Sequence, residues 1–262
     1  MYMIISFFKQ SILSYKSLFG YLDPKLFVLV KVINPILQLI FFTMLAKFVY
    51  NTDDVTPWLI GNAFLLSIFN VVFGVGAVII TERAFGTLKL VIASTANKFL
   101  VFVGRAFIHV IDSVVTVAIG LFVGHILFRV DFSNTNFLLL ILCALVSMYA
   151  AMGLGLLVGS FGLLVKDVNL ILNLVMFSLL IFTGAQYAIE ALPQVLQWIP
   201  DILPITRGIE ASRLIVAGDI SSHVYSLLGM EFFVGTIYIL LGYFTLKTLE
   251  NIAKKKASLD AF

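Results

Sequence analysis

The chain has 262 residues, of which 12% are charged and 61% are apolar. Soluble domains carry roughly 25% charged and 45–50% apolar residues, so this composition excludes a water-soluble protein and indicates several membrane spans. Lysine and arginine outnumber aspartate and glutamate by 17 to 14, and the net charge of +3 is too small and too dispersed to indicate nucleic-acid binding.

Residues 1–24 predict an amphipathic helix that lies at the membrane interface. Apolar residues recur there at helical spacing, with lysine, serine and glutamine between them. The pair Asp23-Pro24 ends this helix. No short apolar core with a small-residue cleavage site follows Lys9 and Lys16, so the segment does not resemble a removable signal peptide.

Six long apolar segments follow, and each predicts a membrane-spanning helix, because roughly 20 apolar residues cross a bilayer. Helices are favoured over strands, since an open strand leaves its backbone groups unpaired in hydrocarbon. The predicted fold is all-α, a single transmembrane domain over residues 1–262 with spans one to five within residues 26–187. The six segments are residues 26–47, 58–80, 101–128, 137–163, 168–187 and 227–247.

The distribution of positive charge predicts the orientation. With the N-terminus in the cytoplasm, the inside segments hold eleven lysine and arginine residues and the outside segments hold four. Because positive charge favours the cytoplasmic side, we expect both termini inside, with residues 248–262 as a cytoplasmic tail.

Two features of the first span have structural interpretations. Asn34-Pro35 frees a backbone carbonyl and predicts a kink. Lys31 lies close enough to Lys25 for its stem to reach back to the interface, so we expect it to be an anchor.

The connection between the second and third spans ends the preceding helix with the charged pair Glu82-Arg83. A short helix that opens near Thr87 places Leu88, Val91 and Ile92 on one apolar face. Such a helix can lie parallel to the membrane and offer this face to another subunit. The alternative is an ordinary loop whose arginine follows the inside-positive rule.

The third span carries three ionisable residues on one face, Arg105, His109 and Asp112. Ionisable groups within spans are costly and therefore candidates for function. Their spacing lets the basic and acidic groups pair along the helix, which is a structural role. Alternatively, because the segment is longer than the bilayer requires, Arg105 lies at the cytoplasmic surface.

Two pairs of small residues predict close helix contacts. Gly120 and Gly124, and Gly155 and Gly159, each have the small-xxx-small spacing within an apolar helix. This spacing lets helices approach closely, within one protomer or between two.

Residues 188–226 interrupt the pattern of spans. Pro193, Pro200 and Pro204 alternate there with apolar residues, which suits short broken helices that dip into the outer leaflet and line a path. The alternative is a proline-rich extracellular cap. Glu231 lies just inside the last span, where Arg207 or Arg213 is its expected partner.

Two motifs resemble the type-2 ABC exporter permeases, the membrane subunits of drug, antibiotic, bacteriocin and polysaccharide exporters. The first is Glu-Arg-x-x-Gly-Thr-Leu between the second and third spans. The second contains Gly184, Leu192-Pro193, the stretch over residues 203–213 and Gly218. Together with the topology, the two motifs cover essentially the whole chain.

The resemblance implies that the region from Arg83 to about Ser94 is a coupling helix that docks into a groove of an ATP-hydrolysing subunit. The family often has a proline shortly after this helix, and residues 93–98 contain none. The residues implied in coupling are Glu82, Arg83, Gly86, Thr87, Leu88 and Val91. The residues implied in the outer motif are Pro193, Pro204, Thr206, Glu210 and Arg213.

The chain contains no Gly-x-x-x-x-Gly-Lys-Ser/Thr loop, so we expect ATP and magnesium to bind the partner and no cofactor, catalytic residue or metal site here. The predicted function is export of an amphiphilic drug, antibiotic, peptide or lipid-linked molecule from bacteria across the cytoplasmic membrane. Its partners are an ABC ATP-binding subunit, a second permease protomer, identical or related, and membrane lipids. The alternatives are a polysaccharide or teichoic-acid exporter permease, an integral-membrane lipid enzyme, and a non-transporting anchor that recruits an ATPase.

Overall fold

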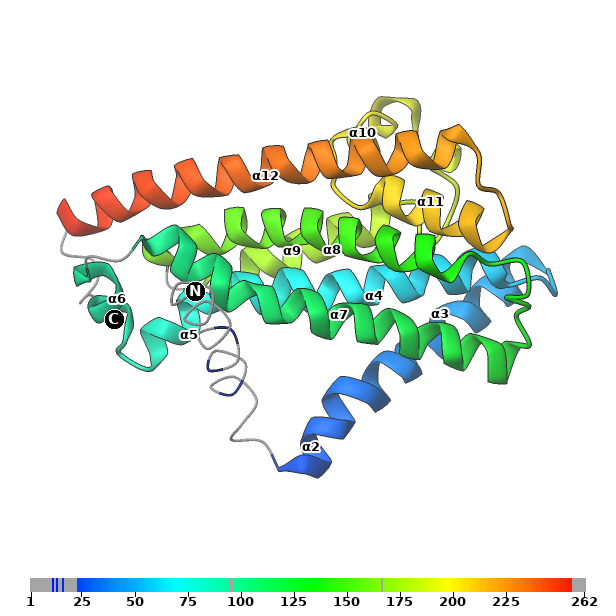
Figure 1. Cartoon of the computed structure of the whole chain (residues 1–262), viewed down its shortest axis with the longest axis horizontal. Helices are drawn as coiled ribbons and strands as arrows, with labels where there is room; N and C mark the ends of the chain where they lie inside the picture. Colours follow the sequence, from blue (N-terminus) through cyan, green and yellow to red (C-terminus); the bar gives the residue numbers. More distant parts are fainter. Residues whose placement is uncertain are drawn as a thin grey trace.

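The computed structural model describes Ser11, Leu13, Lys16 and residues 23–94, 97–165 and 167–255. These residues form helices and no strand, which confirms the all-α class. The long helices run side by side along one axis as a bundle (Figure 1). The predicted interfacial helix over residues 1–24 lies largely outside the described residues.

Five helices of the described chain are long and apolar enough to cross a membrane. The predicted fifth span is a shorter apolar helix, α9 (Val168–Phe182), of 15 residues. At about 1.5 Å per residue it falls short of a hydrocarbon core of about 30 Å, so a count of six spans stays a prediction. The five long helices are Pro24–Tyr50, α4 (Thr56–Gly76), α7 (Lys98–Phe128), α8 (Phe137–Ser160) continued by η2 (Phe161–Leu163), and α12 (Ser222–Lys255).

Helix α4 is the centre of the bundle. Its most apolar window is 78% buried, whereas that of the first span is 11% buried. Both predicted glycine pairs contact it, Gly120 and Gly124 from α7 and Gly155 and Gly159 from α8. A Cβ atom at Gly159 would lie 2.9 Å from the Cα atom of Gly76, so only glycine permits this approach. The predicted close contacts are confirmed within the protomer.

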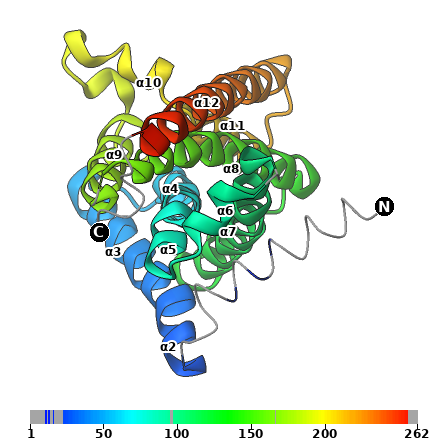
Figure 2. The ribbon, with the colours of Figure 1, turned by 90° about the vertical axis from the view of Figure 1, so that its left-hand side faces the viewer.

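The first span changes its helical geometry just before Pro35, where a kink was predicted. It consists of α2 (Pro24–Val28), the π-helical turn η1 (Leu29–Ile33) and α3 (Asn34–Tyr50), and Figure 2 shows α2 leaning away from the bundle. The wider turn precedes Pro35, which has no N–H to donate. The expectation that Lys31 anchors the span at the interface is wrong, because its side chain is 8% exposed and its Nζ lies 2.5 Å from the Asp112 carboxylate on α7.

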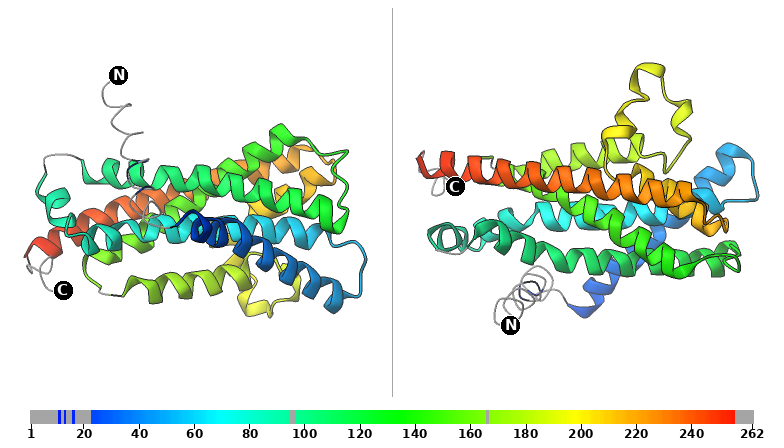
Figure 3. Two further views of the ribbon diagram at one scale, coloured as in Figure 1. Left: turned by 90° about the horizontal axis from the view of Figure 1, so that it is seen from below. Right: turned by 45° about the horizontal axis from the view of Figure 1, so that its top comes forward.

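The two ends of the bundle differ in structure, and α12 runs from one to the other (Figure 3). One end carries α5 (Val78–Ala84) and α6 (Leu88–Ala93). The opposite end carries the broken segment, whose short helices between prolines are observed, while its re-entrant placement stays a prediction. These helices are η3 (Ile189–Ala191), η4 (Gln194–Leu196), α10 (Ile199–Ile202) and α11 (Thr206–Val216).

Candidate functional site

The turn between α5 and α6 is closed by the residues of the Glu-Arg-x-x-Gly-Thr motif. The amide of Thr87 donates to the Glu82 carbonyl (2.9 Å), and the amide of Gly86 donates to the Arg83 carbonyl (3.0 Å). Gly86 has a φ of 71°, a conformation that strains residues with a side chain. The Thr87 hydroxyl donates to the Glu82 carboxylate. The motif therefore builds a tight turn that projects α6 from the end of the bundle.

The charged pair Glu82-Arg83 ties this turn to two neighbouring elements. The Glu82 carboxylate forms an ion pair with Arg105 on α7, and both side chains are mostly buried. Arg83 donates to the carbonyl of Leu163 (2.9 Å) and to that of Val165 (3.5 Å), at the end of α8. Each residue of the pair therefore holds a different part of the bundle to the turn.

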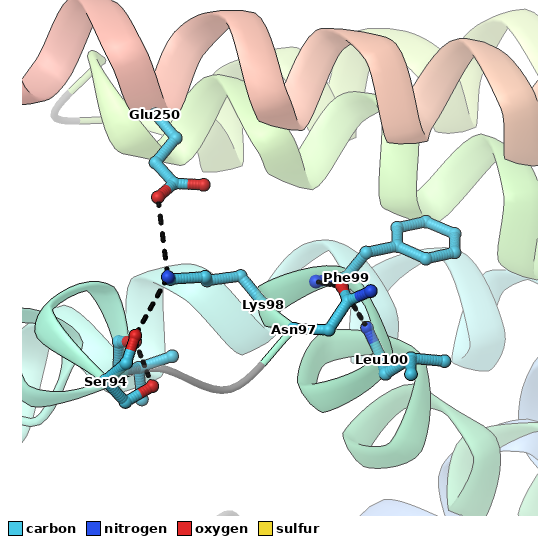
Figure 4. A network of polar contacts seen from close by, with 7 residues as sticks. Ser94, Asn97, Lys98, Phe99, Leu100 and Glu250 are labelled. Carbon is cyan, nitrogen blue, oxygen red and sulfur yellow. Dashed lines mark hydrogen bonds and ion pairs between the residues drawn. The ribbon is translucent and has the colours of Figure 1, made fainter.

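Lys98, at the start of α7, connects α6 to the last helix. Its Nζ donates to the carbonyl of Ser94 (2.9 Å) and lies 3.9 Å from the Glu250 carboxylate on α12 (Figure 4). Asn97 caps α7 by accepting from the amide of Phe99 (3.1 Å). No local pattern predicts this contact, because Lys98 and Glu250 are far apart in the chain.

The outward face of α6 is not the predicted one. Leu88 and Ile92 are 2% and 5% exposed and belong to the core, and Val91 packs against that core. The predicted contact face of these three residues therefore points inward and supports the helix. The apolar surface at this end is instead formed by Phe85 and Leu90, which are 57% and 71% exposed.

Arg105 and Asp112 form ion pairs with other helices, and Asp112 also interacts electrostatically with His109 along α7. Arg105 pairs with Glu82, and Asp112 pairs with Lys31 on the first span. His109 is buried against α4, where a Cβ atom at Gly74 would lie 2.4 Å from its Nδ1. The three residues thus tie α7 to different neighbours and do not converge on one catalytic point.

At the opposite end, a buried carboxylate binds the backbone of the broken segment. Glu231 on α12 is fully buried, and its Oε1 accepts from the amide of Ile205, directly before α11. Ile205 has a φ of 94°, so the chain turns sharply after the buried Pro204. Glu231 therefore supplies the acceptor that a strained helix start requires. The carboxylate thus accepts a hydrogen bond from this backbone amide, and the expected partner Arg207 interacts with it electrostatically.

The outer arginines also bind backbone carbonyls. Arg213 donates through Nε to the Pro57 carbonyl (2.8 Å) and through Nη2 to the Ala185 carbonyl (3.1 Å). Arg207 donates to the Asp201 carbonyl (2.7 Å). Burial lowers the pKa of Arg213 to about 10, which still leaves it charged at neutral pH. Arg213 thus joins α11 to the start of α4 and to the chain after α9.

The remaining residues of the outer motif are divided between surface and interior. Pro193 is exposed, whereas Thr206 is 6% exposed at the start of α11. Glu210 is exposed, and its Oε1 lies 3.5 Å from Nε2 of His223. Among the described residues, no group of three or more His, Cys, Asp or Glu side chains is placed to hold a metal ion. The outer motif therefore stabilises the backbone of the broken segment, and its described residues bring no set of reactive side chains together.

A bundle of apolar helices with a braced polar turn at one end defines a multi-pass membrane protein. The family model of the ABC-2 type transporter matches residues 10–216, which is most of the chain and includes the first motif and the second motif except Gly218. The chain therefore belongs to the ABC-2 type transporter family, whose members are permease domains of ABC transporters and work with an ABC ATP-binding partner. No curated protein shows a significant match to the sequence.

Proposed function

We propose that this protein is the membrane subunit of a bacterial ABC exporter. It moves an amphiphilic molecule out across the cytoplasmic membrane, with both of its own termini in the cytoplasm. ATP is hydrolysed by a separate subunit, since the chain contains no phosphate-binding Gly-x-x-x-x-Gly-Lys-Ser/Thr loop. Two permease protomers, identical or related, work with two ATPase subunits.

The main support for the proposal is the α5–α6 turn. It exposes an apolar tip, and ion pairs and hydrogen bonds hold it to the bundle. Phe85 and Leu90 present large apolar side chains at the end of the bundle. An exposed apolar patch on a structure that is otherwise firmly tied is typical of a docking surface. We assign this tip as the contact with the ATPase.

The braces behind the tip supply a route for movement. Ion pairs and hydrogen bonds join the turn to α7 through Arg105, to the end of α8 through Arg83, and to α12 through Lys98. A displacement of the tip by the ATPase therefore acts on three long helices together. The ATPase shifts the permease between two conformations only if it binds them with different affinity, so this contact must differ between the two states.

The rival class, an integral-membrane lipid enzyme, requires polar catalytic groups that converge at one depth. Arg105 and Asp112 have partners on different helices, which favours a bracing role for them over a catalytic one. A permease for polysaccharide or teichoic acid would use the same coupling turn. It differs from the proposed exporter only in the molecule that it transports. The large apolar fraction of the chain favours an amphiphilic cargo.

Co-purification tests the proposal directly. The protein extracted from its native membrane should bring an ATP-binding subunit with it, and Phe85→Asp with Leu90→Asp should remove that subunit by placing charge in the apolar contact. Val195→Asp is the matched control, because Val195 is 75% exposed in the broken segment at the opposite end. Absence of any ATP-binding subunit from the unaltered protein, or its retention by the double variant, contradicts the proposal.

A further inference from the structure

A large groove of the described structure lies between α7 and α8, at the end of the bundle opposite α6. It encloses about 510 Å³, within the roughly 300–1,000 Å³ range typical of small-molecule sites. Its walls are apolar, with Val117 and Leu121 from α7 and Phe137 and Ile141 from α8. The coupling turn and the broken segment do not line it.

One edge of this groove carries a fixed negative charge. Asp131, in the connection between α7 and α8, lines the groove and accepts hydrogen bonds from the amide (2.9 Å) and the hydroxyl of Ser133. These two hydrogen bonds hold the pKa of Asp131 below its ordinary value, so the carboxylate is ionised at neutral pH. Arg129 lies two positions earlier in the chain but does not line the groove.

Aromatic rings stand beside this carboxylate. Phe132 lies 6.3 Å from the ring of His125 and 6.5 Å from that of Phe137, measured between ring centroids, and all three residues line the groove. His125 Nδ1 lies 3.0 Å from the Val130 carbonyl, which only accepts, so Nδ1 carries the proton of this hydrogen bond. The faces of the two phenylalanine rings attract cations. The carboxylate and the rings therefore favour ligands of the same sign.

We propose that this groove binds a hydrophobic organic cation. The apolar body of the ligand lies between α7 and α8, and its positive centre meets Asp131 next to Phe132. An anionic phospholipid is disfavoured, because its phosphate would approach the same carboxylate. That the bound cation is also the exported cargo rests on the proposed function, whereas the binding itself does not.

The charge preference is tested with two probes of matched shape and opposite charge. Tetraphenylphosphonium should bind the purified, detergent-solubilised protein saturably, and tetraphenylborate should bind much more weakly. Asp131→Asn should weaken tetraphenylphosphonium binding about fivefold, the effect expected of one partly exposed ion pair. Asp219→Asn is the control, since Asp219 is an exposed aspartate outside the groove. Equal binding of the two probes, or unchanged affinity in Asp131→Asn, overturns the proposal.

The location of the site is tested by filling the groove. Ala118 lines it and is exposed, so Ala118→Trp adds bulk without disturbing the core and should remove tetraphenylphosphonium binding. Ala118→Leu is a milder filling variant and should weaken binding even if the tryptophan variant fails to fold. Full binding in a folded filling variant overturns the assignment of the groove.

Binding at equilibrium needs no ATP, which keeps this inference separable from the proposed function. Saturable binding without ATP-driven export of tetraphenylphosphonium contradicts the cargo role alone. Export of tetraphenylphosphonium by a protein that shows no binding in this groove contradicts only the assignment of the groove as the binding site.

Discussion

At the α5–α6 end of the bundle, a largely buried carboxylate pairs with a side chain of another helix, whereas at the opposite end a buried carboxylate binds the backbone. Glu82 meets Arg105 at the first end, while Glu231 meets the amide of Ile205 at the second. The difference follows from the secondary structure at each end. Regular helices satisfy their own backbone and leave side chains available to tie them together, but a segment broken by prolines leaves amides and carbonyls that need partners.

The largest effect on stability is expected at the broken segment. Glu231→Leu should lower the free energy of unfolding by about 2–3 kcal/mol, because the buried amide of Ile205 loses its side-chain acceptor. Glu231→Gln keeps an acceptor and should cost less. Thermal unfolding in detergent, followed by tryptophan fluorescence, measures both. Met230→Leu, an exposed neighbour, is the control, and an unchanged midpoint in Glu231→Leu would contradict the assigned role.

At the coupling end, the main effect is expected on transport. Glu82→Ala removes the partner of Arg105 and the acceptor of the Thr87 hydroxyl, so the turn is no longer held to α7. Export should fall about tenfold, equivalent to about 1.4 kcal/mol, while membrane insertion and ATP hydrolysis continue. Transport assays with the ATPase partner measure this, with the exposed Glu190→Ala as control. Normal coupled export in Glu82→Ala would remove the turn from the mechanism.

A smaller effect is expected from the turn glycine. Gly86→Ala should destabilise the turn by about 1 kcal/mol, because Gly86 has a positive φ and no atom of the fold lies within reach of an added Cβ. The cost is conformational, so Gly86→Asn should be milder, since asparagine tolerates this region better. The rate of tryptic cleavage after the exposed Lys89 reports the opening of the turn. Equal cleavage rates in the two variants would refute the conformational account.

The smallest effect is expected from the contact between α7 and α12. The Lys98–Glu250 separation of 3.9 Å is long, so removing the pair should change the free energy of unfolding by less than about 1 kcal/mol. A double-mutant cycle with Lys98→Gln and Glu250→Gln isolates this coupling energy. The exchanged pair Lys98→Glu with Glu250→Lys should restore it, and a zero coupling energy would mean that the two side chains act independently.

Features that follow from local spacing were predictable from the sequence. The apolar segments predicted the long helices, the glycine pairs predicted close helix contacts, and the prolines predicted short helices in the broken segment. The Glu-Arg-x-x-Gly-Thr motif predicted the position of the turn before α6. These features depend on residues a few positions apart, so a helical repeat or a single backbone constraint is enough to identify them.

Features that depend on packing between distant segments were not predictable. The pairing of Asp112 with Lys31 depends on how the first span meets α7, and helical spacing offered a nearer partner in Arg105. The inward face of α6 depends on the core beneath Leu88 and Ile92, which a short apolar helix does not disclose. The shorter length of α9 shows that apolar composition alone does not determine where a helix ends.

The buried pair between Lys31 and Asp112 has a consequence for biosynthesis. The lysine is made 81 residues before the aspartate. At about 5–20 residues per second, it therefore waits several seconds for its partner to leave the ribosome. An unpaired lysine within a span costs up to about 2.5–3.5 kcal/mol, the value at mid-membrane, so the first span is held less firmly in the bilayer until the third arrives. Its insertion is thus completed after that of a later helix, and the order of assembly differs from the order of synthesis.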